Sequence, residues 1–278
     1  MIRARRRFAQ HFLEPVWVDK VVRAVDPRPT DRLLEIGPGR GALTRQLAPR
    51  VERLLAVEID RDLAARLLAA DLPNVTVKVA DILDVDLAAA SFEWLRVPLT
   101  GSTPIRVFGN LPYNISSPIL FRLLDLAATT GGVSDAVLML QKEVADRLVA
   151  PPGTSEYGVL TILTALGADV TRVLGLPPGA FRPAPRVHSA VVRLVFRPPP
   201  VEVSDVALLT RMVRRMFMLR RKTLLNALTP FGVEIGVPSA RALTLAALDP
   251  RRRPETLQLI EIARLADVFA ASNQRPML

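Results

Sequence analysis

The sequence of 278 residues contains no cysteine and only two histidines. Without cysteine the chain can form neither disulfides nor thiolate metal sites, and two histidines far apart in sequence give no reason to expect a metal. No stretch reaches the roughly 20 apolar residues of a membrane helix. The basic start, residues 1–7, lacks the apolar segment of a signal peptide. We therefore expect a cytoplasmic protein with no membrane partner.

Positive charge is in excess, with a formal net charge of +10. A field of that sign favours a polyanion as partner, either nucleic acid or an anionic membrane surface. A base composition rich in arginine codons would give the same total, so the placement of the basic residues has to decide. Apolar residues make up 50% of the chain, which indicates a globular protein.

Short apolar runs alternate with longer amphipathic ones between residues 32 and 149. The expected strands are 32–36, 54–57, 75–79, 105–108 and 136–140, and the expected helices are 41–51, 62–70 and 118–128. This alternation predicts an α/β fold, a Rossmann-like parallel sheet with helices on both faces. We expect a buried helix at 159–170 and a late strand of the same sheet at 189–196.

Three consecutive prolines, residues 198–200, break regular structure and predict a domain boundary. Residues 1–200 would form the sheet domain. Helical spacing at 208–228 and 257–269 predicts that residues 201–278 form a small all-α C-terminal domain.

A glycine-rich turn, residues 35–41, lies where the first strand is expected to meet the first helix. Such a turn lets backbone amides approach a ligand closely. Gly37, Gly39 and Ala42 also satisfy the dinucleotide fingerprint, with Glu58 downstream, so a nicotinamide enzyme is an open alternative.

Acidic residues mark the ends of the first three expected strands: Glu35, Glu58 and Asp81. Ligands of open α/β sheets bind beyond these carboxyl ends. Glu58 could accept hydrogen bonds from ribose hydroxyls and Asp81 from an adenine amine. The set therefore suits a ligand with an ammonium group, a ribose and an adenine.

The strongest motif is Asn110-Leu111-Pro112-Tyr113, at the end of the fourth expected strand. The exocyclic nitrogen of adenine is a poor nucleophile because its lone pair is delocalised into the ring. The Asn110 side chain and the Leu111 carbonyl could accept hydrogen bonds from its two N–H groups, with Pro112 fixing the loop. Tyr113 could stack on a flipped base. This pattern predicts methyl transfer to a planar amine through positioning, without a metal or a general base.

Several segments together resemble the ribosomal RNA adenine dimethyltransferases. They are residues 7–13, 35–39, 110–116, 141–144, 181–194 and 220–224. The resemblance covers the chain from about Arg7 to the C-terminal helices. Within the family, the sequence is most similar to the small-subunit branch. The resemblance implies an S-adenosylmethionine methyltransferase sheet and N6,N6-dimethylation of two adjacent adenines in the 3′-terminal hairpin loop of small-subunit (16S) rRNA, with a role in subunit biogenesis. The expected partner is that rRNA or an assembling 30S subunit, and the expected state is a monomer.

The resemblance also implies the site residues. S-adenosylmethionine would contact His11, Leu13, Gly37, Glu58, Asp81 and Asn110. Asn110, Leu111 and Tyr113 would hold the adenine, with Phe181 as a second stacking surface. His11 replaces the usual asparagine of the family, and His188 replaces a usual aspartate.

Residues 201–278 carry 12 lysines and arginines against seven acidic residues, and thus half of the excess charge. The basic clusters expected to contact RNA phosphates are Arg214, Arg215, Arg220, Arg221 and Lys222, on one helix with no acidic partners, and Arg251, Arg252 and Arg253. Arg3 to Arg7 could add a flexible basic arm.

Two further functions stay open beside small-subunit rRNA methylation. One is methylation of adenine in large-subunit rRNA, which confers antibiotic resistance. The other is a non-catalytic assembly factor on a methyltransferase scaffold, against which the intact residues 110–113 argue.

Overall fold

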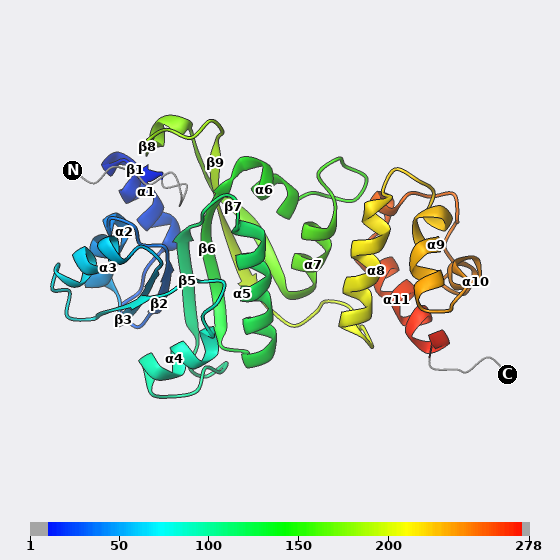
Figure 1. Ribbon diagram of the computed structural model, residues 1–278, viewed down its shortest axis with the longest axis horizontal. Helices are drawn as coiled ribbons and strands as arrows, with labels where there is room; N and C mark the ends of the chain where they lie inside the picture. Colours follow the sequence, from blue (N-terminus) through cyan, green and yellow to red (C-terminus); the bar gives the residue numbers. More distant parts are fainter. Residues whose placement is uncertain (1–10, 274–278) are drawn as a thin grey trace. The chain divides into compact units, whose positions relative to one another are not determined.

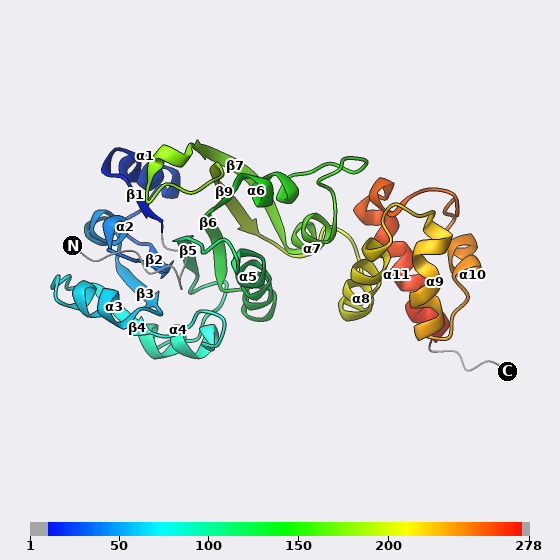
Figure 2. The same cartoon turned by 45° about the horizontal axis from the view of Figure 1, so that its top comes forward.

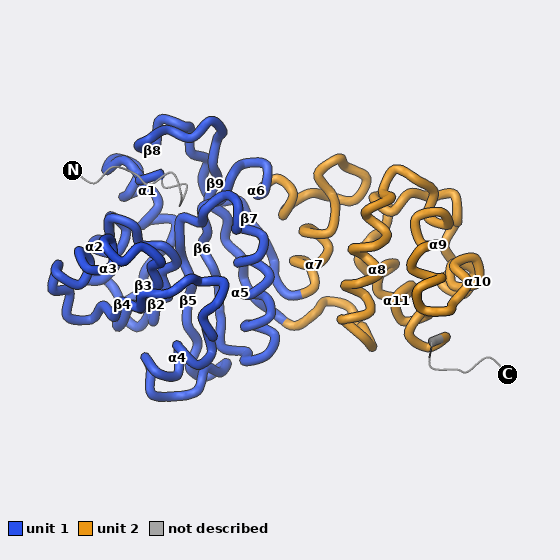
Figure 3. Tube along the Cα trace, viewed as in Figure 1, with its two compact units in different colours: residues 1–145, 167–197 blue, residues 146–166, 198–278 orange. Residues whose placement is uncertain are grey.

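The computed structural model describes residues 11–273 and divides the chain into two compact units (Figure 3). Unit 1 comprises residues 1–145 and 167–197, and unit 2 comprises residues 146–166 and 198–278. The expected boundary at residue 200 would leave residues 146–166 in the sheet domain, whereas in the structure they belong to unit 2. They pack in unit 2, where Tyr157 Oη donates to the Leu257 carbonyl at 2.8 Å and Gly153 N donates to the Glu255 carbonyl at 2.7 Å. The predicted arm, Arg3 to Arg7, lies outside the described residues.

Unit 1 is built on a seven-stranded sheet with the strand order β4-β3-β2-β5-β6-β9-β7 (Figure 1). Its strands are β2 Arg32–Ile36, β3 Arg53–Glu58, β4 Val75–Val79, β5 Ile105–Asn110, β6 Val133–Gln141, β7 Ala168–Leu176 and β9 Ser189–Phe196. The strands from β2 to β6 are parallel, which confirms the predicted α/β fold. The sheet is mixed rather than purely parallel, because β9 runs antiparallel to both β6 and β7.

Helices cover both faces of this sheet, as predicted. Those of unit 1 are α1 Pro15–Val25, α2 Ala42–Leu47 with a 3₁₀ turn at Ala48–Arg50, α3 Arg61–Leu68, α4 Leu87–Leu95 and α5 Ser116–Thr130, and α6 Lys142–Leu148 ends across the boundary. Val22 of α1, Leu47 of α2 and Leu67 of α3 share one buried core with Leu33 and Phe108 of the sheet. Figure 2 shows α4 and α5 on the opposite side of the strands from α1 and α2. Burial on both faces explains the continuous apolar character of the central strands.

The helix expected at 159–170 is shorter in the structure. Helix α7 spans Val159–Gly167, and the chain enters β7 at Ala168 without a loop. Strand β7 lies at the sheet edge and most of its side chains are at least partly exposed, so no apolar run marks it in the sequence. Helices α1 and α4 were not predicted either.

A two-stranded antiparallel sheet joins the start of the described chain to the segment after β7. Strand β1, Phe12–Leu13, pairs with β8, Phe181–Arg182, which follows a 3₁₀ turn at Pro178–Ala180. This pairing fixes His11 and Phe12 beside unit 1's main sheet, and it spans almost the whole length of that unit in sequence.

Unit 2 is helical, as predicted. Its later helices are α8 Val206–Met218, α9 Leu224–Glu234, α10 Ser239–Leu245 and α11 Leu259–Asn273, with a 3₁₀ turn at Pro254–Thr256. The single helix expected at 208–228 is two helices. Thr223 begins the second, because its Oγ1 accepts a hydrogen bond from Asn226 N at 3.5 Å as an N-cap.

Candidate active site

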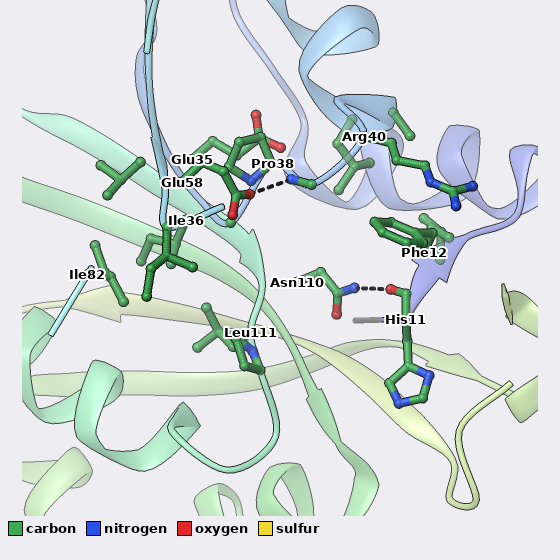
Figure 4. Close-up of a pocket in the computed structure, with 18 of the residues that line it drawn as sticks. His11, Phe12, Glu35, Ile36, Pro38, Arg40, Glu58, Ile82, Asn110 and Leu111 are labelled. Atoms are coloured by element: carbon green, nitrogen blue, oxygen red, sulfur yellow. Dashed lines mark hydrogen bonds between the residues drawn. The ribbon is translucent and has the colours of Figure 1, made fainter. Parts of the chain in front are cut away.

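A cavity of about 490 Å³ opens at the carboxyl ends of β2, β3, β4 and β5, where parallel topology brings successive strand ends together (Figure 4). Strand β1 also contributes to its wall. The predicted site residues that line it are His11, Leu13, Gly37, Glu58, Asp81, Asn110, Leu111, Pro112 and Tyr113. The structure thus brings together in one cavity all the predicted cofactor contacts and the whole 110–113 loop.

The glycine turn after β2 forms one wall. Gly37 and Gly39 have φ angles of +69° and +58°, in the left-handed region that favours glycine. A Cβ at residue 39 would meet the Phe12 ring at 3.3 Å, so the turn and β1 approach closely. The Arg40 guanidinium lies 4.0 Å from the centroid of the same ring, a cation–π contact (Figure 4).

Glu58, at the end of β3, is held rigidly. Its two carboxylate oxygens accept hydrogen bonds from Gly39 N and Asp60 N, both at 2.9 Å. Burial raises the pKa of Glu58, while these backbone hydrogen bonds oppose the shift. The hydrogen bond to Gly39 also ties the end of β3 to the glycine turn, so Glu58 shapes the cavity as well as lining it.

Glu35, in β2, lies deeper in the wall and is only 2% exposed. Thr44 Oγ1 of α2 donates to its Oε2 at 2.6 Å. Burial raises the pKa of Glu35 from its ordinary value of 4.5 to about 8, the Thr44 hydrogen bond opposes this, and the nearby Glu58 charge adds to it. At neutral pH the side chain is therefore mainly protonated, and a cation that entered the cavity would favour its ionised form.

Asp81 follows β4 and sits in a turn. Its Oδ1 accepts a hydrogen bond from Leu83 N at 2.9 Å. No residue between 11 and 273 donates to its Oδ2, which remains available to a donor in the cavity.

Asn110 ends β5, and the backbone of the N-terminal segment orients its amide. Asn110 Nδ2 donates to the His11 carbonyl oxygen at 3.0 Å (Figure 4). Because a carbonyl can only accept, this contact fixes the amide nitrogen toward His11 and turns Oδ1 away from it. Within the described chain, neither Asn110 Oδ1 nor the Leu111 carbonyl oxygen receives a hydrogen bond. The site therefore presents two vacant acceptors on consecutive residues.

Tyr113 is fixed at both its ring and its hydroxyl group. Its Oη is hydrogen bonded to Ser189 Oγ of β9 at 2.8 Å, and burial raises its pKa. The His11 ring stacks on the Tyr113 ring with centroids 5.6 Å apart and an interplanar angle of 23°.

Phe181 does not occupy its predicted place. It is 0% exposed and belongs to the core beneath α1, rather than to the cavity wall. Phe181 does not line the cavity, so in this structure it does not form the predicted second stacking surface. The adjacent Arg182 lines the cavity instead.

The prediction also missed apolar walls of the cavity. Ile59 and Ile82 line it, each directly after a predicted acidic residue, and Phe12 lies between two predicted cofactor contacts. These residues could have been predicted from the sequence, because each is adjacent to a residue already expected in the site.

The basic clusters lie in unit 2, in two structural settings. Arg214 and Arg215 are in α8, whereas Arg220, Arg221 and Lys222 lie in the turn before α9. The expectation that acidic partners are absent is wrong, because three arginines form ion pairs. These are Arg215 with Glu234 at 3.0 Å, Arg251 with Asp249 at 3.3 Å and Arg252 with Glu261 at 2.5 Å.

Arg220 donates to the Ser155 carbonyl at 2.8 Å, and Arg221 and Lys222 are exposed. Among residues 11–273, no helix is long and apolar enough to cross a membrane.

Comparisons with known proteins agree on one family. The model of the family described as ribosomal RNA adenine dimethylase matches residues 1–263. The chain is 44% identical to ribosomal RNA small subunit methyltransferase A of Syntrophotalea carbinolica, over 96% of this chain and 97% of that protein. It is 38% identical to the protein of the same name from Proteus mirabilis, over 98% and 95%.

Two solved structures share the fold over nearly the full chain. The crystal structure of a dimethyladenosine transferase from Plasmodium falciparum matches with a TM-score of 0.72 and 25% identity, over 92% of this chain and 96% of that one. The 23S rRNA methyltransferase ErmE matches with a TM-score of 0.64 and 26% identity, over 93% and 99%.

Proposed function

This chain belongs to the ribosomal RNA adenine dimethylase family, and we propose that its substrate within that family is small-subunit rRNA. It is an S-adenosylmethionine-dependent rRNA adenine dimethyltransferase, and the nicotinamide alternative is set aside. Its target would be the N6 atoms of two adjacent adenines in the 3′-terminal hairpin loop of 16S rRNA. The names of the similar bacterial proteins support the choice of subunit. Unpaired loop bases also cost little to extrude.

The cavity fits S-adenosylmethionine by its chemistry. When bound, this cofactor supplies an electrophilic methyl group on a sulfonium. Asp81 Oδ2 is available to accept from an amine, and the buried Glu35 would be stabilised in its ionised form by an ammonium group. The apolar Ile59 and Ile82 offer faces for a planar ring. His11, Leu13, Gly37, Glu58, Asp81 and Asn110 are proposed to hold it.

The orientation of Asn110 carries the proposed mechanism. Its Oδ1 and the Leu111 carbonyl oxygen are vacant acceptors, and an exocyclic amine has two N–H groups to donate. Accepting both would hold the nitrogen in place and favour a more pyramidal, more nucleophilic amine. Neither acceptor titrates, so the loop acts by positioning. Stacking on Tyr113 would contribute about 1–3 kcal/mol to holding the base.

The helical unit is proposed to track RNA phosphates, chiefly through the exposed Arg221 and Lys222. Arg214, Arg215, Arg220, Arg251 and Arg252 would contribute less, because each already has an interaction within the protein. We further propose that the protein acts in the cytoplasm as a monomer, on free small-subunit rRNA or on the assembling 30S subunit.

Large-subunit rRNA is the second candidate substrate, because the likeness to ErmE extends over 93% of the chain. Small- and large-subunit rRNA, each as purified RNA and within immature ribosomal subunits, would be incubated with the protein and labelled S-adenosylmethionine, then digested and examined by mass spectrometry. We expect dimethyladenosine in the small-subunit RNA alone, at two adjacent positions. Label in the large-subunit RNA alone would overturn the choice of subunit, and no label in either would overturn the proposed function.

A further inference from the structure

The His11 side chain occupies the cavity-facing surface on which the proposed mechanism places the target base. His11, Asn110 and Tyr113 line one cavity, and the imidazole is stacked on the Tyr113 ring with centroids 5.6 Å apart. Aromatic pairs in contact have centroids about 4.5–7 Å apart, so the two rings touch. A base inserted between them would need roughly two stacking layers of 3.4 Å each. The slot between the His11 and Tyr113 rings is therefore too narrow for a base while His11 stays in place.

The ring is held there by a contact of its own. His11 Nδ1 lies 2.7 Å from the Pro183 carbonyl oxygen. Because that oxygen can only accept, Nδ1 carries the proton and the ring has a single preferred orientation. Tyr113 is fixed on its other side through Ser189. The stack is thus a defined arrangement with a hydrogen bond at each end.

From these contacts we propose that His11 is a placeholder for the target adenine: its ring covers Tyr113 in the RNA-free protein and is displaced when the base enters. This inference rests on the proposed function. Displacement of the His11 ring leaves the 110–113 loop intact, because Asn110 is oriented by the main-chain carbonyl of His11 and not by its side chain. The imidazole can rotate about its own side-chain bonds while that hydrogen bond persists.

The arrangement also provides selectivity. Every base that enters must break the His11–Tyr113 stack and its hydrogen bond to Pro183. Adenine offsets this cost by donating two hydrogen bonds to Asn110 and Leu111, whereas a base without an exocyclic amine at that position does not. His11 is thus a positioning and specificity residue that acts before the chemical step.

The test is a set of kinetic measurements on the full-length protein with a small-subunit rRNA hairpin at saturating S-adenosylmethionine. We expect His11→Ala to lower the KM for RNA by roughly 2- to 10-fold, the equilibrium equivalent of one lost aromatic pair. His11→Phe keeps a ring on Tyr113, so its KM should stay near that of the unchanged protein. His188→Ala is the matched control, because His188 does not line the cavity. Binding of S-adenosylhomocysteine checks that each variant keeps its cofactor site.

A second measurement reports on the slot without turnover. The same hairpin with 8-vinyladenine, a fluorescent base that keeps the 6-amino group of adenine, at the target position should bind His11→Ala more tightly, with stronger quenching by stacking. A higher KM or weaker quenching in His11→Ala would overturn the proposal and make His11 a second wall of the slot. An unchanged KM and unchanged quenching would show that the His11 ring plays no part in base entry. If the unchanged protein transfers methyl groups in these assays, either of these two outcomes would refute the proposed role of His11 without contradicting the proposed function.

Discussion

The cavity of unit 1 and the basic surface of unit 2 differ in how their polar groups are held. In the cavity, Glu58 and Asn110 are part of the fold's own hydrogen-bond network, and each is fixed by backbone atoms. In unit 2, Arg221 and Lys222 are exposed to solvent in a turn. Fixed groups suit chemistry, which needs alignment within a fraction of an ångström, whereas exposed cations suit phosphates, which need charge. The two regions should therefore respond to mutation in different ways.

The largest effect is expected at Asn110. Asn110→Ala removes one of the two vacant acceptors and should lower methyl transfer on the order of 100-fold or more, as loss of a preorganised group does in other enzymes. RNA affinity should stay within about twofold, because the phosphates are bound elsewhere. Tritiated methyl transfer and filter binding measure the two quantities. Asn226→Ala, at an exposed asparagine of α9, is the control. Comparable losses of methyl transfer and of RNA affinity would show that chemistry and RNA binding are not divided between the two units.

The position of Asn110 was predictable, and the reason is topological. Parallel strands end at one edge, so Glu58, Asp81 and Asn110 had to converge once the strands were recognised. Apolar runs of the buried strands carried that signal.

The pairing of β1 with β8 has no such signal, because two-residue strands far apart in sequence leave no periodicity. The inward direction of Phe181 and the stacking of His11 on Tyr113 follow from that segment, and neither could be foreseen. The ion pairs of unit 2 are hidden for a similar reason. Arg215 and Glu234 lie on different helices, and only their packing brings them together.

Asp81 should show the next largest effect, confined to the cofactor. Asp81→Asn keeps the oxygen that accepts from Leu83 N but replaces a charged acceptor with a neutral one. We expect roughly 10-fold weaker binding of S-adenosylhomocysteine, because hydrogen bonds to charged groups are the stronger ones. Isothermal titration calorimetry measures this. Asp84→Asn, an exposed residue in the same turn that does not line the cavity, should bind as the unchanged protein does. Equal losses in both variants would mean that the turn, not the Asp81 charge, matters.

Glu35 should make cofactor binding depend on pH. Its pKa is about 8, so it is mainly protonated at pH 7, and an ammonium group favours the ionised form. Affinity should rise by about fivefold from pH 7 to pH 8, and by about another twofold before it levels off near pH 9. Glu35→Gln should flatten this rise. An identical pH profile in the variant would show that Glu35 does not face the cation.

The same shift has a consequence for stability in the cofactor-free protein. The folded state binds the Glu35 proton more tightly than the unfolded state does, so this contribution is complete below pH 4.5 and is lost as pH rises through about 8. The unfolding temperature of Glu35→Gln, relative to the unchanged protein, should therefore increase over that range. Thermal unfolding at several pH values measures the difference.

The smallest effect is expected on the basic surface of unit 2, where charge is spread over several side chains. Replacing Arg221 and Lys222 together by glutamine should weaken rRNA binding only a few-fold at physiological salt. The slope of log affinity against log salt should fall by roughly 1 to 2, since each lost phosphate contact removes a little under one unit. Methyl transfer at saturating RNA should be unchanged, which contrasts with Asn110→Ala. Arg241→Gln, an exposed arginine of α10, is the single-charge control and should leave the slope unaltered. An equal change in that control would mean that net charge alone, rather than the turn before α9, attracts the RNA.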